Sequence, residues 1–159
     1  GYCTKRQYTY FMKNVIPWEK KQIEEGVEFF NFYLSIEKNT QQKRIDKRAT
    51  SPLVYWKISE NDLKMLDKWD AFTLYKEQMF KRTSYDEAPW IVLNANNKKV
   101  AILSALRFIL NAFDYPDKDL PKPKTWSEGL NNYKVEINKV LFENLSYQQY
   151  KTLRVFADE

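Results

Sequence analysis

The chain has 159 residues and a mass of 19.2 kDa, and its 43% hydrophobic and 16% aromatic content lies outside the range of disordered sequences and suits one domain with a sizeable core. Lys and Arg outnumber Asp and Glu by 26 to 21, and the resulting formal net charge of +5 favours an anionic partner. Histidine is absent and one cysteine occurs, which excludes Ser-His-Asp and Cys-His catalysis, phosphohistidine chemistry and an internal disulfide.

Glycine spacing and hydropathy exclude further classes. The three glycines, at positions 1, 26 and 129, cannot form the phosphate loop G-x-x-x-x-G-K-[ST] or the dinucleotide fingerprint G-x-G-x-x-G in any register. No apolar run reaches the roughly 18 residues of a membrane-spanning helix, and the chain begins without the basic-then-apolar pattern of a signal peptide. We therefore expect a cytoplasmic protein without a membrane partner.

Two short helices are predicted at the start of the chain. Thr4 is placed to cap a helix over residues 5–14. Pro17 favours the beginning of a second helix over residues 18–25, and Gly26 is placed to end it.

A strand and a basic helix follow. Residues 27–36 (VEFFNFYLSI) are β-branched and aromatic with little alternation, as expected of a strand covered on both faces of a parallel sheet. The segment 37–59 is polar and basic. Four of its cations recur at i,i+4 spacing along one side of a predicted helix: Lys43, Arg44, Lys47 and Arg48.

A long amphipathic helix is predicted next, up to about Phe80. Ser59 and Asp62 resemble a capping box at its start. Apolar side chains then recur at near-helical spacing, namely Leu63, Leu66, Trp69, Phe72 and Met79.

A second strand over residues 88–95 (APWIVLNA) leads into an apolar helix over residues 97–113. Two buried strands separated by a helical excursion indicate an α/β fold whose parallel sheet carries an enlarged connection that acts as a mobile cover. The tail begins as a Pro/Lys-rich linker, and residues 133–142 (YKVEINKVLF) predict a strand or hairpin. Ser146 is placed to cap a last helix that runs through Phe156.

Five blocks of residues 1–116 carry a resemblance to a known family. They read, in order, GYCTKRQYTYFMKNVIPWEK, FFNFYLSI, KRIDKRATSPLVYWKISENDLK, WDAFTLYKEQMFKRT and APWIVLNANNKKVAILSALRFIL. The most specific positions are Pro52, Trp56, Lys57 and Ser59, then Trp69 with Asp70, Arg82 with Thr83, and Ala88, Pro89 and Trp90. In this order the blocks resemble the C-terminal half of the polyphosphate kinase 2 family.

The resemblance implies a fold and an activity. The fold is the C-terminal part of a P-loop kinase-type three-layer sandwich, spanning residues 1–116 with a helical lid over about 38–82. Residues 117–159 are then a linker and a small C-terminal extension. The implied activity is Mg²⁺-assisted phosphoryl transfer between inorganic polyphosphate and nucleoside mono- or diphosphates, with ADP/ATP, GDP/GTP or AMP as nucleotides. A homo-oligomer is also implied.

Basic residues in the lid suit this chemistry, because phosphoryl transfer depends on positioning and on neutralising the charge of the phosphate oxygens. The phosphate-binding candidates are Arg44, Arg48, Lys57 and Arg82, and the weaker candidates are Lys43, Lys47, Lys98 and Lys99. A solvated helix face is the competing interpretation for Lys43 and Lys47, and a cation at a helix C-terminus is the one for Arg82.

Other residue types are better explained by structure than by function. Packing is the favoured interpretation of Trp56, Trp69 and Trp90, with base stacking as the alternative. The acidic residues Asp62, Asp70 and Asp86 are interpreted as caps, surface groups or ion-pair partners rather than metal ligands.

In the family, the phosphate loop and the magnesium-associated acidic motif lie N-terminal to the point where this chain starts. We therefore expect no catalytic residue or metal ligand in this chain, and a missing N-terminal half as its partner. The preferred hypothesis is the lid-bearing half of a polyphosphate kinase. A non-catalytic polyanion-binding remnant is the alternative, and a nucleic-acid module is disfavoured because no such binding signature occurs. Nucleotide preference, direction of transfer, the role of the tail and the oligomeric state stay open, as does whether the chain is a truncated reading frame, a proteolytic product or a split enzyme.

Overall fold

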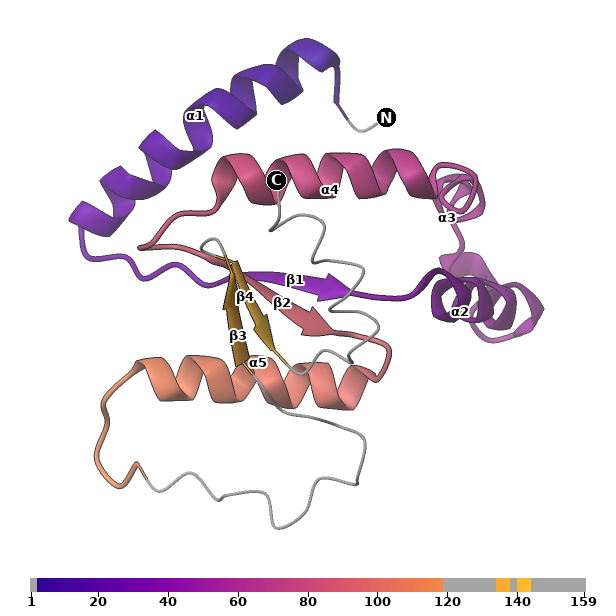
Figure 1. Ribbon diagram of the computed structural model, residues 1–159. Coiled ribbons are helices and arrows are strands. Elements are labelled where there is room, and N and C mark those ends of the chain that lie inside the picture. The colour runs from indigo at the N-terminus through magenta and orange to yellow at the C-terminus, as the bar shows by residue number, and fades with distance from the viewer. Residues whose placement is uncertain (1–2, 119–133, 138–139, 144–159) are drawn as a thin grey trace.

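The computed structural model describes residues 3–118, 134–137 and 140–143, which form three layers (Figure 1). Helices α1 (Lys5–Glu24) and α4 (Trp69–Thr83) cover one face of a sheet, and α5 (Lys98–Ala112) covers the other. The elements of the segment predicted to form a lid, called the lid elements below, lie beyond the end of the first strand. They are α2 (Lys38–Thr50), the 3-10 turn η1 (Tyr55–Lys57) and α3 (Glu60–Lys64). The predicted α/β class with helices on both faces is confirmed.

The sheet has the order β1-β2-β4-β3. Strands β1 (Asn31–Ser35), β2 (Trp90–Asn94) and β4 (Val140–Glu143) are parallel, and β3 (Lys134–Ile137) is antiparallel to β4. The parallel pairing of the first two strands and the hairpin in the tail are therefore as predicted. Strand β1 is shorter than expected, because residues 27–30 form no ladder with β2. The predicted helix between Ser146 and Phe156 lies outside the described residues.

The prediction of two N-terminal helices is wrong, because α1 runs without interruption through Pro17. A proline inside a helix removes one i to i−4 hydrogen bond, here to the carbonyl of Lys13. Both Lys13 and Pro17 are exposed, so water can satisfy that carbonyl. The caps are as expected: the Thr4 side chain accepts a hydrogen bond from the Gln7 amide, and Gly26 follows the helix at φ 91°.

The prediction of a single long helix between residues 59 and 80 is also wrong. The chain forms the short helix α3, then a turn, and only then α4. The Ser59–Asp62 capping box is present, but it starts α3 rather than a long helix. The turn lets α3 leave the line of α4, which Figure 1 shows at the lid end of the molecule.

The core lies on both faces of β2, where Ile91, Val92 and Leu93 are all buried. Ile91 and Leu93 pack with Leu141 toward α5, where the rings of Phe32 and Phe108 meet edge to face at 5.8 Å. On the other face the buried ring of Phe80 from α4 contacts the rings of Tyr33 and Trp90 at centroid distances of 5.2 and 5.8 Å. The continuous apolar run of β2 thus reflects burial on two sides.

Helix α5 agrees with its predicted range and is capped by Asn97, whose side chain accepts hydrogen bonds from the amides of Lys99 and Val100. Its buried residues Val100, Ala101 and Ser104 face the sheet. A second apolar stripe on α5 remains exposed and comprises Ile102, Leu103, Leu106 and Leu110. None of the helices in the described ranges has the length and apolar character needed to cross a bilayer.

Candidate functional site

The carboxyl edge of the parallel strands is where ligands bind in open α/β sheets, and the lid is anchored there. Arg44 from α2 donates through Nη2 to the carbonyl oxygens of Ala95 and Asn96, both at 2.8 Å. The Asn96 side chain accepts a hydrogen bond from the Glu37 amide at 3.0 Å, just before α2 begins. These three bonds join the start of the lid to the loop that follows β2.

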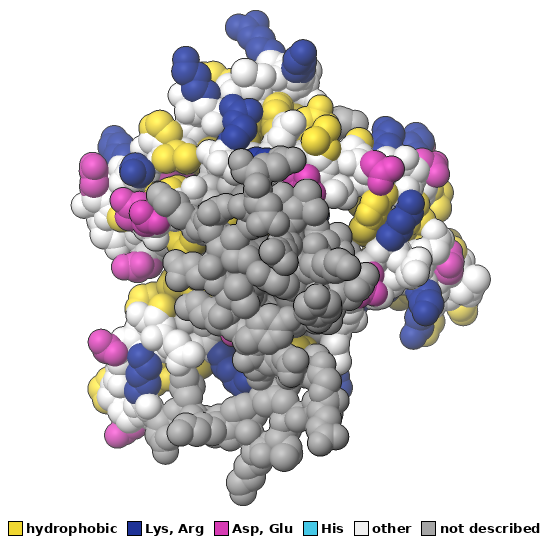
Figure 2. All heavy atoms as spheres, in the orientation of Figure 1, with side chains coloured by type: hydrophobic (Ala, Val, Ile, Leu, Met, Phe, Trp, Pro, Cys, Tyr) yellow, Lys and Arg dark blue, Asp and Glu magenta, His cyan; other side chains and the backbone are white. Residues whose placement is uncertain are grey.

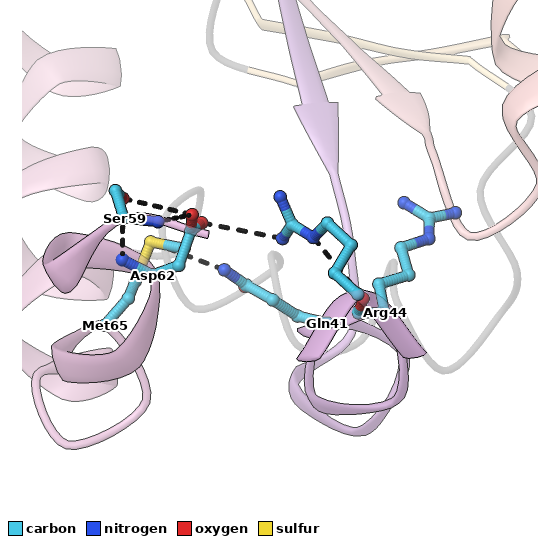
Figure 3. Close-up of polar contacts among 6 residues, drawn as sticks. Gln41, Arg44, Ser59, Asp62 and Met65 are labelled. Atoms are coloured by element: carbon cyan, nitrogen blue, oxygen red, sulfur yellow. Dashed lines mark hydrogen bonds and ion pairs between the residues drawn. The ribbon is translucent and has the colours of Figure 1, made fainter. Parts of the chain in front are cut away.

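A second set of contacts joins α2 to α3. The Arg48 guanidinium lies 3.5 Å from Asp62 Oδ1, and its Nε donates to the carbonyl of Arg44 at a long 3.4 Å. Asp62 also accepts hydrogen bonds from the amide and hydroxyl of Ser59, both at 3.0 Å (Figure 3). The amide of Ser59, with a further contribution from Arg48, lowers the pKa of the Asp62 carboxyl below its ordinary value. Figure 3 shows Arg44 directed away from Ser59 and Asp62, so Arg44 contacts the loop after β2 while Arg48 pairs with Asp62.

The three candidate lysines of the lid elements, Lys43, Lys47 and Lys57, are exposed. Lys57 in η1 extends over the indole of Trp56, with Nζ 5.1 Å from the ring centroid. Lys43 and Lys47 lie on the exposed side of α2. None of these three lysines makes an ion pair to another described residue that would hold it in place, so each can turn toward an anion.

Lys98 and Lys99 are the first two residues of α5. They directly follow the loop whose Ala95 and Asn96 carbonyls accept hydrogen bonds from Arg44. The amides of a helix N-terminus attract anions, and two exposed cations there reinforce that field. Sequence and structure therefore bring these two weaker candidates to the same edge of the sheet as Arg44.

Arg82 lies elsewhere. It is exposed in the last turn of α4, just before the segment that leads into the amino end of β2. The hydrogen bond from the Trp90 amide to the Ser84 hydroxyl, at 3.2 Å, fixes that connection. The structure thus separates Arg82 from Arg44, because one is near the start of β2 and the other is bonded to its end.

A cavity of about 420 Å³ lies between α1, β1 and α4 and reaches Ser35 and Ile36 at the carboxyl end of β1. Its walls are mostly apolar, and among the described residues that line it Lys76 from α4 is the one that carries a charge. Burial lowers the pKa of the Lys76 ammonium, an effect that the nearby Glu77 partly reverses. Lys76 is not among the site residues predicted from the sequence. Its signal was a cation four residues after Phe72 and three before Met79, on the apolar stripe of the helix.

A magnesium site needs several oxygen ligands close together. Within the described residues, no three His, Cys, Asp or Glu side chains gather closely enough to hold a metal ion. The described side chains do not fit the implied Mg²⁺, so no step through a metal is assigned to this part of the chain.

On the face seen in Figure 2, basic side chains are interspersed with acidic ones rather than gathered into one patch.

A three-layer α/β sandwich in which three of the four described strands are parallel belongs to the P-loop kinase type of fold. Residues 1–121 match the family profile Polyphosphate kinase 2 (PPK2), and the chain belongs to that family.

Curated relatives and solved structures agree with this assignment. The chain is 37% identical over 134 residues to Polyphosphate kinase PPK2B of Corynebacterium glutamicum, covering 81% of this chain and 44% of the relative. It is 39% identical over 119 residues to GDP-polyphosphate phosphotransferase of Pseudomonas aeruginosa, covering 75% of this chain and 33% of the relative. The crystal structure of polyphosphate kinase 2 from Arthrobacter aurescens superimposes with a TM-score of 0.65 at 28% identity, covering 77% of this chain and 44% of that one. The chain thus spans less than half the length of these relatives.

Proposed function

We propose that this chain is the lid-bearing C-terminal portion of an enzyme that transfers phosphoryl groups between inorganic polyphosphate and nucleoside mono- or diphosphates. The observation that carries the proposal is the double hydrogen bond from Arg44 to the carbonyls of Ala95 and Asn96. It fixes a basic helix at the carboxyl edge of the sheet, where substrate phosphates would lie. Family membership supplies the chemistry, and the partial coverage of the relatives explains why the sequence lacks a phosphate loop.

The residue roles follow from the contacts. The Arg44 guanidinium donates to two backbone carbonyls, so its role is to position the lid. It can bind phosphate only if those two hydrogen bonds are broken. Arg48, Lys57, Lys98 and Lys99 are the residues we assign to phosphate oxygens in the assembled site. Arg82 remains a candidate for the far end of a long polyphosphate chain rather than for the reacting group. Magnesium, when bound, would neutralise charge on the transferred phosphoryl group, and its ligands are assigned to the N-terminal half.

Polyanion binding without catalysis is the second candidate. It is favoured by one observation, that Lys43, Lys47 and Lys57 are exposed and make no ion pair to another described residue. In that case the lid cations bind polyphosphate without turnover.

A binding and turnover experiment tests both. The 159-residue chain is titrated with long-chain polyphosphate at several salt concentrations, and ATP formation from ADP is followed with and without the N-terminal portion of the Corynebacterium glutamicum relative. We expect salt-dependent binding by the chain alone and turnover only with the added portion. Lys57→Met should reduce the salt slope by about one unit, as expected for one lost phosphate contact, while the control Lys13→Met on α1 should not.

Absence of polyphosphate binding at low salt contradicts the proposal. Binding without turnover in the presence of the added portion, although that mixture forms a stable complex, favours the polyanion-binding candidate. Turnover by the isolated chain would show that catalysis needs no separate phosphate loop.

A further inference from the structure

Helix α1 carries an aromatic stripe that the rest of the described chain leaves exposed. Phe11 and Trp18 are about two helical turns apart, so they lie on one side of α1, and their side chains are 58% and 57% exposed. Gln7 and Asn14 continue the stripe, because the four positions follow one another at intervals of four, three and four residues. Figure 1 shows α1 at the periphery of the molecule, where a second helix can approach it.

The stripe is distinct from the face of α1 that packs on the molecule. Met12 and Glu19, each one residue after a ring of the stripe, are the buried residues of the helix. One residue corresponds to a rotation of about 100° around the helix axis, so the stripe lies beside the packed face. Trp18 also meets Phe29 edge to face at a centroid distance of 5.9 Å, which widens the apolar surface. Exposed rings of this kind gain from burial against another apolar surface.

The charges at the two ends of α1 oppose the helix dipole. Lys5 and Arg6 lie in the first turn, where negative charge is favourable, and Glu24 and Glu25 lie at the last residue and the C-cap, where positive charge is favourable. Lys21 in the last turn offsets part of this. A second helix that lies antiparallel compensates the arrangement, because it places its acidic end beside the basic start of the first helix.

One register serves both the rings and the charges. In an antiparallel pair related by a two-fold axis, each residue faces the residue at an equal distance on the other side of that axis. An axis between Asn14 and Val15 places Phe11 opposite Trp18 of the second copy, and this contact occurs twice. The same axis places Lys5 opposite Glu24 of the second copy.

We infer that this stripe is the interface of a two-fold dimer, in which the α1 helices of two copies of the chain lie antiparallel and Phe11 of each packs on Trp18 of the other. Pairs of Lys5 and Glu24 close the two ends of the contact. A polyanion is a poor occupant of the stripe, because Glu24 and Glu25 repel it at one end. The inference goes beyond the proposed function, since it requires neither the lid nor a phosphate.

Disulfide cross-linking tests the register. Cys3, which is exposed, is first replaced by Ser, and one cysteine is then introduced by Asn14→Cys or by Lys13→Cys. Asn14 lies next to the proposed axis, whereas Lys13 is equally accessible but points away from the stripe. Under mild oxidation we expect Asn14→Cys to form a covalent dimer at least about tenfold faster than Lys13→Cys, as measured by intact mass.

Truncation of one ring tests the energetics. All proteins in this experiment carry Leu106→Lys, so that the exposed stripe of α5 does not contribute to association. We expect Trp18→Ala to weaken dimerisation at least about tenfold in sedimentation velocity experiments, because large aromatic side chains dominate interfaces. The matched control is Trp56→Ala, an exposed tryptophan of the lid, which should leave dimerisation unchanged. Circular dichroism spectra and melting temperatures show whether both variants fold.

Charge reversal tests the pairing at the ends without touching the rings. Lys5→Glu and Glu24→Lys each place like charges opposite one another in the proposed register, so each should weaken dimerisation about fivefold at low salt. The double variant restores opposite charges and should dimerise as well as the parent. High salt should reduce all of these differences.

Three outcomes overturn the inference. Equal cross-linking of Asn14→Cys and Lys13→Cys means that the copies meet at random. Equal dimerisation of Trp18→Ala and Trp56→Ala, both folded, means that the contact lies elsewhere. If the N-terminal portion of the Corynebacterium glutamicum relative binds the chain and abolishes the Asn14→Cys disulfide, the stripe is covered within a longer protein and not by a second copy.

Discussion

Phe80 is a buried residue that joins the helix layer of α1 and α4 to the sheet. Its side chain is 1% exposed, and its ring contacts Tyr33 from β1 and Trp90 from β2, so it fastens α4 to both strands. Truncation would leave a cavity among rings that cannot close around it. We expect Phe80→Ala to lower the free energy of unfolding by about 3–5 kcal/mol.

Urea denaturation followed by circular dichroism measures this change. The control is Leu74→Ala, also on α4, whose side chain is more than half exposed and should cost less than about 1 kcal/mol. Equal losses for the two variants would mean that Phe80 is not a principal contact between the layers.

Glu19 is a buried carboxyl on α1 that accepts a hydrogen bond from the Tyr85 hydroxyl at 2.9 Å. Burial raises its pKa above the ordinary 4.5, and the bond from Tyr85 offsets part of that rise. The folded chain therefore holds the proton to higher pH than the unfolded chain does. The contribution of this group to stability is present in full below about pH 4.5 and is lost as the pH rises through the folded pKa.

We expect Glu19→Gln, which retains an acceptor for Tyr85, to gain stability relative to the wild type as the pH is raised from 4 to 7. Denaturation midpoints of the two proteins at several pH values measure this difference. Glu24→Gln, at the exposed end of α1, is the control and should run parallel to the wild type. A difference for Glu19→Gln that is constant with pH would contradict the assignment.

At the scale of elements, the short helix α3 depends on its cap. Asp62 satisfies the amide of Ser59 and also pairs with Arg48 on α2, so one carboxylate holds two lid elements together (Figure 3). Loss of a capping side chain costs about 1 kcal/mol. We expect Asp62→Ala to accelerate amide hydrogen exchange in α3 about fivefold while global stability changes little.

The same substitution has a functional consequence under the proposed function. Without the carboxylate, Arg48 is free to bind an anion, so polyphosphate should bind more tightly to Asp62→Ala than to the wild type. Asp67→Ala, an exposed residue in the turn before α4, is the control for the change in net charge. Weaker polyphosphate binding to Asp62→Ala would show that α3 must be capped for the lid to bind phosphate.

At the scale of the whole molecule, one side is incompletely covered. Strand β1 has one neighbour among the described strands, Leu34 on it is 56% exposed, and the stripe of α5 that contains Ile102 and Leu106 faces outward. Apolar faces of this kind and open strand edges favour association. This agrees with a chain that spans less than half the length of its relatives.

We expect the isolated chain to self-associate in sedimentation velocity experiments, and Leu106→Lys to weaken this association by about tenfold or more, because an unpaired charge is costly to bury. The control is Leu53→Lys at the lid, where the replaced side chain is 81% exposed. If the two substitutions weaken association equally, the contact is not centred on α5.

Local chemistry made several elements readable from the sequence. The caps at Thr4 and Ser59, the glycine that ends α1 and the apolar run of β2 depend on neighbours within a few residues, and each was predicted correctly. The family, and with it the three-layer fold, also followed from sequence, because five ordered blocks carry residue identities that hydrophobic pattern alone does not.

Tertiary structure decided what depends on distant residues. Only the folded chain showed that α1 continues through Pro17 and packs on α4, and that the turn before Trp69 divides an apolar stripe that looked continuous in the sequence. Arg44 is bonded to Ala95 and Asn96, which lie more than fifty residues away in sequence, so local pattern could not place it. Likewise, only the folded chain shows that Arg82 lies near the opposite end of β2. The cavity around Lys76 likewise combines residues from α1, β1 and α4. Local pattern specifies which residue types a segment carries, but convergence of side chains in space is fixed by how the layers pack.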